Sequence, residues 1–517
     1  MVYIVGPLLA LIAFGVFGRG MVQRSKGRGF NPLRAFLLLL AAFAYRFLVP
    51  GSWLAESYSF IGSHANLLER LTLMLSDMGI GLVLSSLYLR HHRLQSKLFA
   101  VPGVLALILS GGIFGVMSLV QNIHTPHSHT RSDHHEILVE LGPDDSIDEI
   151  VPILREYKAR YWKAFPQVDL SEDEDLAQFY LVCVDSAYTS LLLTALRYDR
   201  ENVDYAEINH SVELIQPIPA KIEVSKQQKF IANDPHLSSQ WYADKLNYNQ
   251  VYEFLREHKP ATKVKLAIVD TGVDSNHEDL KSVFRKSPGG SDNHSHGTHC
   301  AGIASAATNN GKGIGSLNWE GEYFSVGGYK ALDRYGRGTD ETVAKAIIEA
   351  AEGGAAVISM SLGGYHPRPP RVQEEAIKYA KSLGAIVVVA AGNSNDDAKS
   401  YSPANIPGVI VVSAVNESFR KAPFSNYFTQ TKMPIASPGV NIFSTIPKQK
   451  YQSFNGTSMA TPMVAGLVAL MKSFAPELTT NQAYEILHQT GTVVDDSPRI
   501  GRIINPVAAI EAVQTIQ

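Results

Sequence analysis

Four polar side chains in the C-terminal half of the chain are of the types that acyl transfer requires. They are Asp270, His296, Asn393 and Ser458. A Ser hydroxyl can attack a carbonyl if a His accepts its proton, while an Asp orients the His and an Asn amide donates to the oxyanion. The chain order Asp, His, Ser is one of those in which this triad occurs. Each residue alone has a simpler interpretation, as a helix cap or a turn residue.

The segments around these residues indicate the structure that would position them. Continuous apolar runs precede Asp270 in VKLAIVDTGVD and Asn393 in GAIVVVAAGNSN, as expected for buried parallel strands. His296 and Ser458 each stand at the start of a predicted helix, in HSHGTHCAGIASAA and SMATPMVAGLVALM. Open α/β sheets gather functional groups at the carboxyl ends of their strands. The sequence therefore predicts a parallel sheet flanked by helices, with the four side chains near one edge.

Five motifs of this region resemble those of subtilisin-like serine proteases, in the family's order. They are DTGVDSNHEDL, HGTHCAG, SLGG, AAGN and GTSMATP. The resemblance covers residues 233–517 and implies a subtilisin-like peptidase domain. It implies that Asp270 orients His296 and that His296 takes the proton of Ser458, which attacks the peptide carbonyl. Asn393 and the backbone N–H of Ser458 would hold the oxyanion, and no cofactor would be required for catalysis.

The same resemblance implies a cleft for polypeptide substrates. One wall would be formed by Ser361, Leu362, Gly363 and Gly364, whose bare backbone can pair with an extended peptide as an added strand. Gly392 is also assigned to substrate binding. No acidic residue can be assigned to the specificity pocket, so we expect a broad or apolar preference.

Calcium is the one ion that the resemblance suggests. The loop AATNNGKGIGSLN keeps Asn310 but departs from the family's usual strong calcium site. Asp279 and Asn310, with backbone carbonyls, could still bind structural calcium, and a loop without a metal is the open alternative. The two Cys residues, Cys183 and Cys300, fall in regions predicted to be different domains, so no disulfide is expected. Cys300 is predicted to be packed rather than catalytic.

Residues 136–215 are predicted to form a small α+β domain. Three segments look extended, EILVELG, AQFYLVCVD and VDYAEINHSVELI, and they alternate with two amphipathic helices. The first predicted helix, SIDEIVPILREYKARYWKAF, begins with a capping box formed by Ser146 and Glu149. This domain resembles the inhibitory propeptide of the family. Residues 216–232 lack a clear period, and we expect a linker that contains the processing region.

The first 120 residues contain four long apolar stretches. They are Val2–Phe17, Ala35–Leu54, Leu71–Leu89 and Leu98–Val120. A membrane-spanning helix needs roughly 20 apolar residues, so an all-α transmembrane region is predicted. With four spans, both basic loops lie on the cytoplasmic side and the peptidase domain is extracytoplasmic. The His-rich residues 121–135 are predicted to be a linker rather than a metal site, because their His spacing is irregular.

These features together predict a membrane-associated zymogen that processes itself. The expected partners are polypeptide substrates, membrane lipids and the chain's own propeptide-like domain. The net charge of −3 gives no reason to expect nucleic acid. The alternative is a catalytically silent membrane scaffold or receptor with a subtilisin-like fold. The complete set of four active-site residues favours the enzyme.

Overall fold

The computed structural model describes residues 134–214, 218–219, 229–285 and 291–515. Residues 132–517 group into one compact unit. The four predicted membrane spans fall at residues 2–120 and lie outside the described residues. Among the helices that are described, none is both long and apolar enough to cross a bilayer. The membrane helices therefore stay a prediction.

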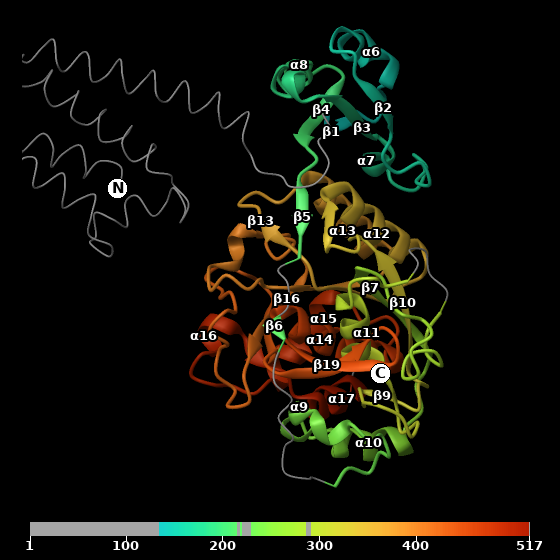
Figure 1. Ribbon diagram of the computed structural model, residues 1–517, viewed down its shortest axis with the longest axis vertical. Helices are drawn as coiled ribbons and strands as arrows, with labels where there is room; N and C mark the ends of the chain where they lie inside the picture. Colours follow the sequence, from blue (N-terminus) through green and yellow to red (C-terminus); the bar gives the residue numbers. More distant parts are fainter. Residues whose placement is uncertain (1–133, 215–217, 220–228, 286–290, 516–517) are drawn as a thin grey trace, which may run out of the picture. The chain divides into compact units, whose positions relative to one another are not determined.

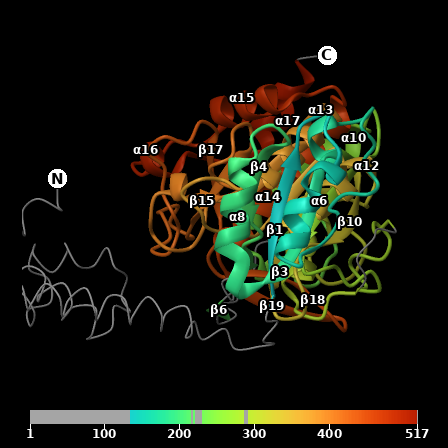
Figure 2. The ribbon, with the colours of Figure 1, turned by 90° about the horizontal axis from the view of Figure 1, so that it is seen from above.

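The N-terminal part of the described chain forms a four-stranded sheet with two helices on one face (Figure 2). Its strand order is β2-β3-β1-β4, and all neighbours are antiparallel. The elements are β1 (His134–Leu141), α6 (Ile147–Glu156), β2 (Arg160–Lys163), α7 (Glu174–Ala177), β3 (Phe179–Asp185), α8 (Thr189–Tyr198) and β4 (Val203–Ile208). An apolar cluster that includes Ile137, Leu154 and Leu192 joins the sheet to α6 and α8. We call residues 134–214 the small domain.

One predicted helix of the small domain is wrong in its second half. Its start is confirmed, because Ser146 and Glu149 form the expected capping box. The helix ends at Glu156, since Lys158 adopts a left-handed backbone conformation with φ 55°. Arg160–Lys163 then pairs with β3 as an edge strand. Sheet pairing has therefore overridden the helical pattern of this segment.

A parallel seven-stranded sheet forms the centre of the larger domain. Its order is β10-β7-β12-β14-β16-β17-β20, and every neighbouring pair is parallel. The strands are β7 (Val264–Asp270), β10 (Phe324–Lys330), β12 (Val357–Met360), β14 (Ile386–Ala390), β16 (Ile410–Val415), β17 (Pro434–Pro438) and β20 (Arg502–Ile503). Both faces are apolar, which explains the continuous apolar runs in the sequence.

Helices cover both faces of this sheet (Figure 1). One face packs against α11 (His296–Ser305) and α14 (Thr457–Phe474), and the outer helices of this side are α9 (Trp241–Lys245), α10 (Tyr248–Glu257), α15 (Thr480–Thr490) and α17 (Pro506–Gln514). The short helix α16 (Ser497–Ile500) packs on β16 and β17 through a separate cluster that includes Val415 and Ala436. The other face packs against α12 (Asp340–Glu352) and α13 (Arg371–Ser382). Successive residues of β7 alternate between the two cores, with Leu266 and Ile268 in one and Ala267 and Val269 in the other.

The small domain packs on α12 and α13. Leu138, Phe179 and Leu181 of its sheet share one apolar cluster with residues of these two helices. At the same interface, the Arg371 guanidinium donates to both carboxylate oxygens of Glu140, at 3.1 and 3.2 Å. Glu140 is only 3% exposed and Arg371 is 37% exposed, so the carboxylate of this fork-shaped pair is shielded from water while the guanidinium is partly exposed. The small domain and the peptidase-like domain thus form one continuous structure.

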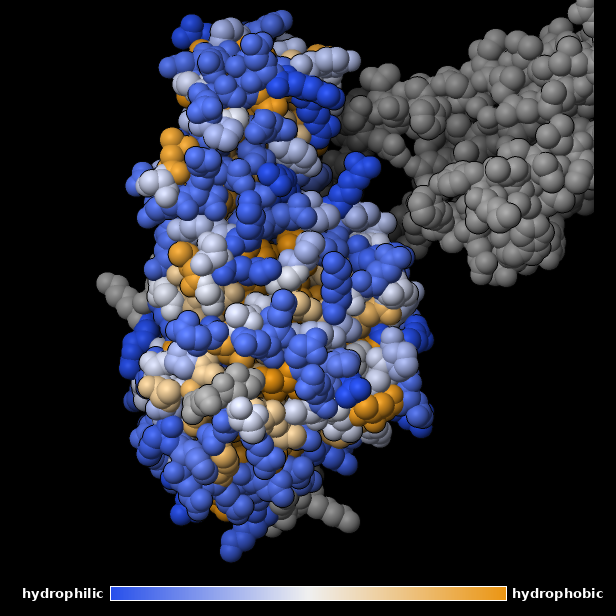
Figure 3. Space-filling view, turned by 180° about the vertical axis from the view of Figure 1, so that it is seen from behind, coloured by the Kyte–Doolittle hydropathy of each residue, from blue (hydrophilic) through white to orange (hydrophobic). Residues whose placement is uncertain are grey.

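The small domain also exposes some large apolar side chains, including Trp162, Leu191 and Tyr198. On the face of the molecule shown in Figure 3, hydrophobic residues are interspersed with hydrophilic ones. Apolar residues that stand singly on a surface are normal in folded proteins.

Candidate active site

Asp270 and His296 form a buried hydrogen-bonded pair. Asp270 is the last residue of β7, and His296 is the first residue of α11. His296 Nδ1 lies 2.8 Å from Asp270 Oδ1 and 2.9 Å from Asp270 Oδ2. The backbone N–H of Thr271 donates to Asp270 Oδ1 at 2.7 Å and helps to hold the carboxylate. The carboxylate can therefore orient the ring and fix the proton on Nδ1.

Burial and the neighbouring carboxylate act on the His296 imidazole in opposite directions. Burial disfavours the charged ring, but the Asp270 carboxylate outweighs it and raises the pKa of His296 well above its usual range. His296 Nε2 is buried and has no hydrogen-bond partner among the described residues. The ring thus has one nitrogen held by a carboxylate and a second nitrogen left to exchange a proton.

Ser458 lies in the first turn of α14, behind the N-cap residue Gly456. It is therefore not the helix cap, which removes the simpler interpretation of this Ser. Its Oγ donates to the Ser361 carbonyl at 3.2 Å, so in this conformation the hydroxyl proton is bonded to that carbonyl and not to His296. A hydrogen bond between a catalytic Ser and its His often forms only once substrate is present. The N–H groups of the first helical turn lack intrahelical acceptors, which favours negative charge beside Ser458.

Asn393 follows β14 and contacts the start of α14. Its Oδ1 accepts from both the N–H and the hydroxyl of Thr457, at 2.9 Å each. The oxygen is thus engaged, and the Nδ2 amide remains as a donor to a further acceptor. This donor and the Ser458 N–H are the pair that the sequence predicted for the oxyanion.

Asn426 is a site residue that sequence reasoning missed. Its Nδ2 donates to the Ala391 carbonyl at 2.8 Å, and its Oδ1 accepts from Ser394 N–H at 2.9 Å. Gly392 lies between them with φ 103°, and a Cβ there would lie 2.4 Å from Asn426 Nδ2. The buried amide therefore fixes the turn that carries Asn393. A single buried Asn has no sequence signal of its own, because its partners lie more than 30 residues away.

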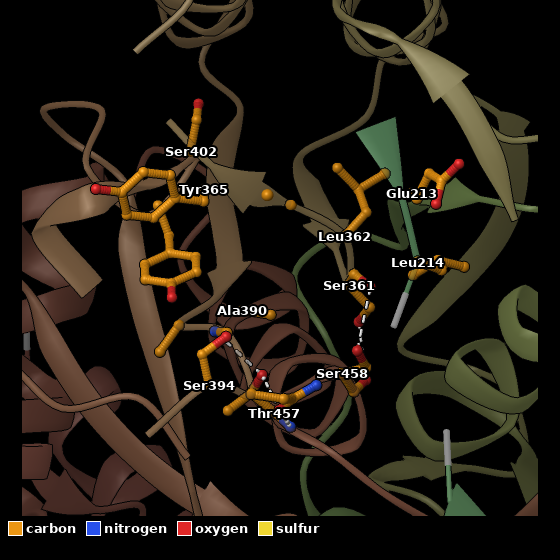
Figure 4. Close-up of a pocket in the computed structure, with 16 residues that line it drawn as sticks. Glu213, Leu214, Ser361, Leu362, Tyr365, Ala390, Ser394, Ser402, Thr457 and Ser458 are labelled. Carbon is orange, nitrogen blue, oxygen red and sulfur yellow. Dashed lines mark hydrogen bonds between the residues drawn. The ribbon is translucent and has the colours of Figure 1, made fainter. Parts of the chain in front are cut away.

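The predicted cleft residues line a cavity of about 320 Å³ that reaches Ser458 (Figure 4). Ser361, Leu362, Gly363, Gly364 and Gly392 all contribute to it, as do Asn393 and Ser394. Gly363 has φ 153°, and a Cβ there would lie 2.5 Å from the Ser402 carbonyl oxygen. The structure thus brings the predicted substrate-binding residues together with Ser458 and Asn393.

The end of the small domain lies in this cleft. Strand β5 (Ser211–Glu213) pairs antiparallel with β11 (Arg337–Thr339), and Leu214 N–H donates to the Gly336 carbonyl at 2.8 Å. Glu213 and Leu214 line the same cavity as Ser458 (Figure 4). Further along the chain, β6 (Ile218–Pro219) pairs with β19 (Lys450–Asn455), which ends just before α14. Strands β5 and β6 are therefore each paired with a strand of the larger domain, β11 and β19.

Cys300 packs behind the Asp270–His296 pair. Its Sγ lies 3.9 Å from His296 Nδ1 and donates to the Ser458 carbonyl at 3.4 Å. The side chain is fully buried, and burial raises the pKa of the thiol. The prediction that Cys300 is packed is confirmed. Cys183 is likewise a free, buried thiol, so the absence of a disulfide between the two is confirmed.

Asp279 and Asn310 lie beside each other, as the calcium prediction requires. Asn310 Nδ2 is 3.3 Å from Asp279 Oδ1, and Asp279 Oδ2 accepts from Ile314 N–H at 2.9 Å. Asp234 joins them, accepting from the N–H groups of Asn309 and Asn310. Burial raises the pKa of Asp279, and it raises the pKa of Asp234 to about 6. Carboxylate and amide oxygens are ligand types that calcium takes, but here Asn310 presents its amide nitrogen to Asp279 and its oxygen to Lys312 N–H.

Comparison with known proteins gives this geometry its context. The model of the subtilase family matches residues 261–501. Thermitase from Thermoactinomyces vulgaris is 40% identical over 255 residues, which are 47% of this chain and 86% of thermitase. The chain belongs to the subtilase family. A thermostable alkaline protease from Halalkalibacterium halodurans is 33% identical to this subtilase over 328 residues, 60% of the chain and 86% of the relative. Like these relatives, this subtilase is a serine endopeptidase.

Solved structures confirm the predicted subtilisin-like α/β fold. The epidermin leader peptide processing serine protease from Staphylococcus aureus superposes on the subtilase with a TM-score of 0.57. The match covers 74% of this chain and 99% of that protein, at 22% identity. At this identity, the likeness bears on the fold alone.

Proposed function

We propose that this subtilase is a membrane-associated endopeptidase, made as a zymogen, that hydrolyses peptide bonds through Asp270, His296 and Ser458. The observation that carries the proposal is the buried Asp270–His296 pair beside the helix that presents Ser458. His296 Nε2 would take the proton of Ser458 Oγ as the oxygen attacks the peptide carbonyl. The same nitrogen would then give the proton to the leaving amine, and water would hydrolyse the acyl-enzyme.

Asn393 would stabilise the oxyanion together with the Ser458 N–H. Asn393→Leu keeps the approximate volume of the side chain but removes the amide donor. We expect kcat to fall by about 10²–10³ with KM nearly unchanged, because the lost hydrogen bond forms mainly in the transition state. Steady-state kinetics with a chromogenic peptide would measure this. A fall confined to KM would contradict the assigned role.

The small domain would act as the inhibitory propeptide. In support, β5 lies in the cleft beside β11, and β6 lies beside β19 on the other side of Ser458. Glu213 and Leu214 at the end of β5 line the cavity that reaches Ser458, and β6 pairs with the strand that precedes α14. Self-cleavage between Leu214 and Ile218 would leave the small domain as a product bound in the cleft.

The membrane anchor, the extracytoplasmic location of the peptidase and the bound calcium belong to the same proposal. The anchor and location rest on the apolar stretches and basic loops of residues 1–120. Calcium would be held by Asp279, Asn310 and Asp234 and would tie the loop around Asn310 to the N-terminal part of the peptidase domain. Cleavage before β6 would free the peptidase domain from its covalent link to the membrane.

The experiment that tests the proposal is fluorophosphonate labelling of the full-length protein in membranes, followed by intact mass. A labelled fragment that begins between residues 215 and 218 is expected. A labelled chain that stays full length would support the serine peptidase activity but overturn autoprocessing. A folded, uncut chain that takes no label would favour the silent scaffold.

The interface between the small domain and α12 should respond to pH. Glu207 of β4 and Asp340 of α12 are both buried there, and burial raises the pKa of each to about 7. Because the bound state holds protons that a water-exposed carboxyl would release near pH 4, association is favoured at low pH. It should weaken as the pH rises from about 4 to about 7. We expect at least about a tenfold loss of affinity across this range.

Size-exclusion chromatography of the processed protein at pH 5 and pH 8 would measure this release. Asp340→Asn should flatten the pH dependence, because its amide is neutral throughout. Glu253→Gln, on the exposed face of α10, should leave it unchanged. Release that strengthens on acidification would contradict the prediction.

A further inference from the structure

The side chains of β5 alternate between the core and the solvent. Val212 is 3% exposed and belongs to an apolar cluster with Leu332, Val343 and Leu362. Ser211 and Glu213, on either side of it, are exposed. Val212 lies opposite Gly338, and Glu213 lies opposite Arg337. The buried Val212 thus fixes the register in which an extended segment lies against β11.

Arg337 and Glu213 form an ion pair across this ladder. Arg337 Nε lies 3.1 Å from Glu213 Oε1, and the two side chains are 39% and 61% exposed. Opposite charges on directly facing strand residues attract each other. Glu213 lines the cavity that reaches Ser458, and it is the only charged residue among those that line it.

The turn before Arg337 holds it in place. Asp333 Oδ1 accepts from the N–H groups of Tyr335 and Arg337, at 2.8 and 3.0 Å, and Asp333 N–H donates to the Arg337 carbonyl at 2.7 Å. Gly336 completes the turn with φ 75°. The backbone of Arg337 is therefore ordered by its own loop, which reduces the entropy lost when a ligand pairs with it.

We propose that Arg337 is a specificity-determining residue that selects substrates with an acidic side chain at the position that Glu213 occupies in β5. The preferred substrate carries a branched aliphatic residue where Val212 lies, followed directly by Glu or Asp. This inference rests on the proposed peptidase function of the same cleft. The backbone of Gly338 and Gly336 accepts any sequence, so the charge of Arg337 supplies the discrimination at this position.

We expect a modest preference for an acidic over a neutral residue at the position of Glu213, and a larger preference for an acidic over a cationic residue. Exposed ion pairs and facing charges of this kind alter binding by about twofold to fivefold. Replacing the acid by Lys also turns attraction into repulsion, so about tenfold discrimination is expected. The acid-to-neutral and acid-to-cation ratios of kcat/KM should both decrease as salt is raised from about 0.05 to about 0.5 M, because solvent-exposed charges are screened.

The test uses three quenched fluorescent peptides with the sequence of residues 209–219. They differ only at the position of Glu213, which is Glu, Gln or Lys. The full-length protein should cleave the Glu peptide with the highest kcat/KM. Because each ratio compares two peptides on one preparation, it does not depend on the fraction of enzyme whose cleft is free of β5.

Substitution at Arg337 should then change the ranking. Arg337→Gln should abolish the preference, and Arg337→Glu should reverse it in favour of the Lys peptide. Arg334→Glu, an equal charge change at an exposed position of the same loop, should leave the wild-type preference intact. Equal cleavage of the three peptides by an active wild type, or loss of the preference in Arg334→Glu as well, would overturn the role of Arg337. A wild type that cleaves none of them and takes no fluorophosphonate would overturn the peptidase function itself.

Discussion

Full-length protein that carries Ser458→Ala is expected to stay one uncut chain and to lose about 10⁶-fold in peptide turnover. The reason is chemical, because the substitution removes the hydroxyl that is proposed to attack the peptide carbonyl. It also removes the hydrogen bond from Ser458 Oγ to the Ser361 carbonyl, which is a single buried contact between neutral groups at 3.2 Å. The fold should therefore survive.

The measurements for Ser458→Ala are intact mass, fluorophosphonate labelling and peptide hydrolysis. Ser473→Ala is a matched control, because it removes a hydroxyl that donates to the Leu470 carbonyl at the far end of the same helix. That variant should still be cut and labelled. A Ser458→Ala chain that is processed at the wild-type rate in the absence of any other protease would show that another group cleaves it.

Asp270→Asn should lower kcat by about 10⁴ while the chain remains folded. An amide can present its N–H to His296 Nδ1, which places the proton on the wrong ring nitrogen. It also removes the negative charge that raises the pKa of His296. Since the base must be neutral to act, kcat/KM rises with pH through the pKa of His296. The substitution should therefore move the acidic limb of the pH profile to lower pH.

A pH–rate profile separates this role from a structural one. Loss of stability alone would reduce the amount of active enzyme at every pH without moving the limb. Asp274→Asn serves as the control, because Asp274 accepts backbone N–H groups from Asn276 and Lys448 and does not contact His296. Its profile should overlay that of the wild type. An unmoved limb in Asp270→Asn would show that the Asp270 carboxylate does not set the pKa of the base.

Much of the larger domain could be predicted from sequence, because burial on both faces of a parallel sheet leaves long apolar runs. The runs that end in Asp270 and Ala390 are of this kind, and the sheet places the residues after them at one edge. The helices that begin at His296 and near Ser458 could also be predicted. Their runs of small residues, which allow close packing against the sheet, are a local property of the sequence.

Features that depend on distant partners could not be predicted. All four residues of Arg160–Lys163 are exposed, and the segment joins the sheet only through pairing with β3, so no hydrophobic period marks it as a strand. Asn426 acts through residues more than 30 positions away. The ion pair between Arg337 and Glu213 joins strands from different domains. In each case the decisive contact is absent from the local sequence.

The burial of α14 has a consequence for how the enzyme loses activity on heating. All 18 residues of this helix are buried, and it packs against β7, β12, β14, β16 and β17 as well as α11. Its amide hydrogens can exchange with solvent only when most of the sheet opens, so the helix belongs to the most slowly exchanging part of the domain. The candidate nucleophile Ser458 therefore lies on an element that is expected to unfold only with the whole domain. Thermal inactivation and global unfolding should occur in a single cooperative transition.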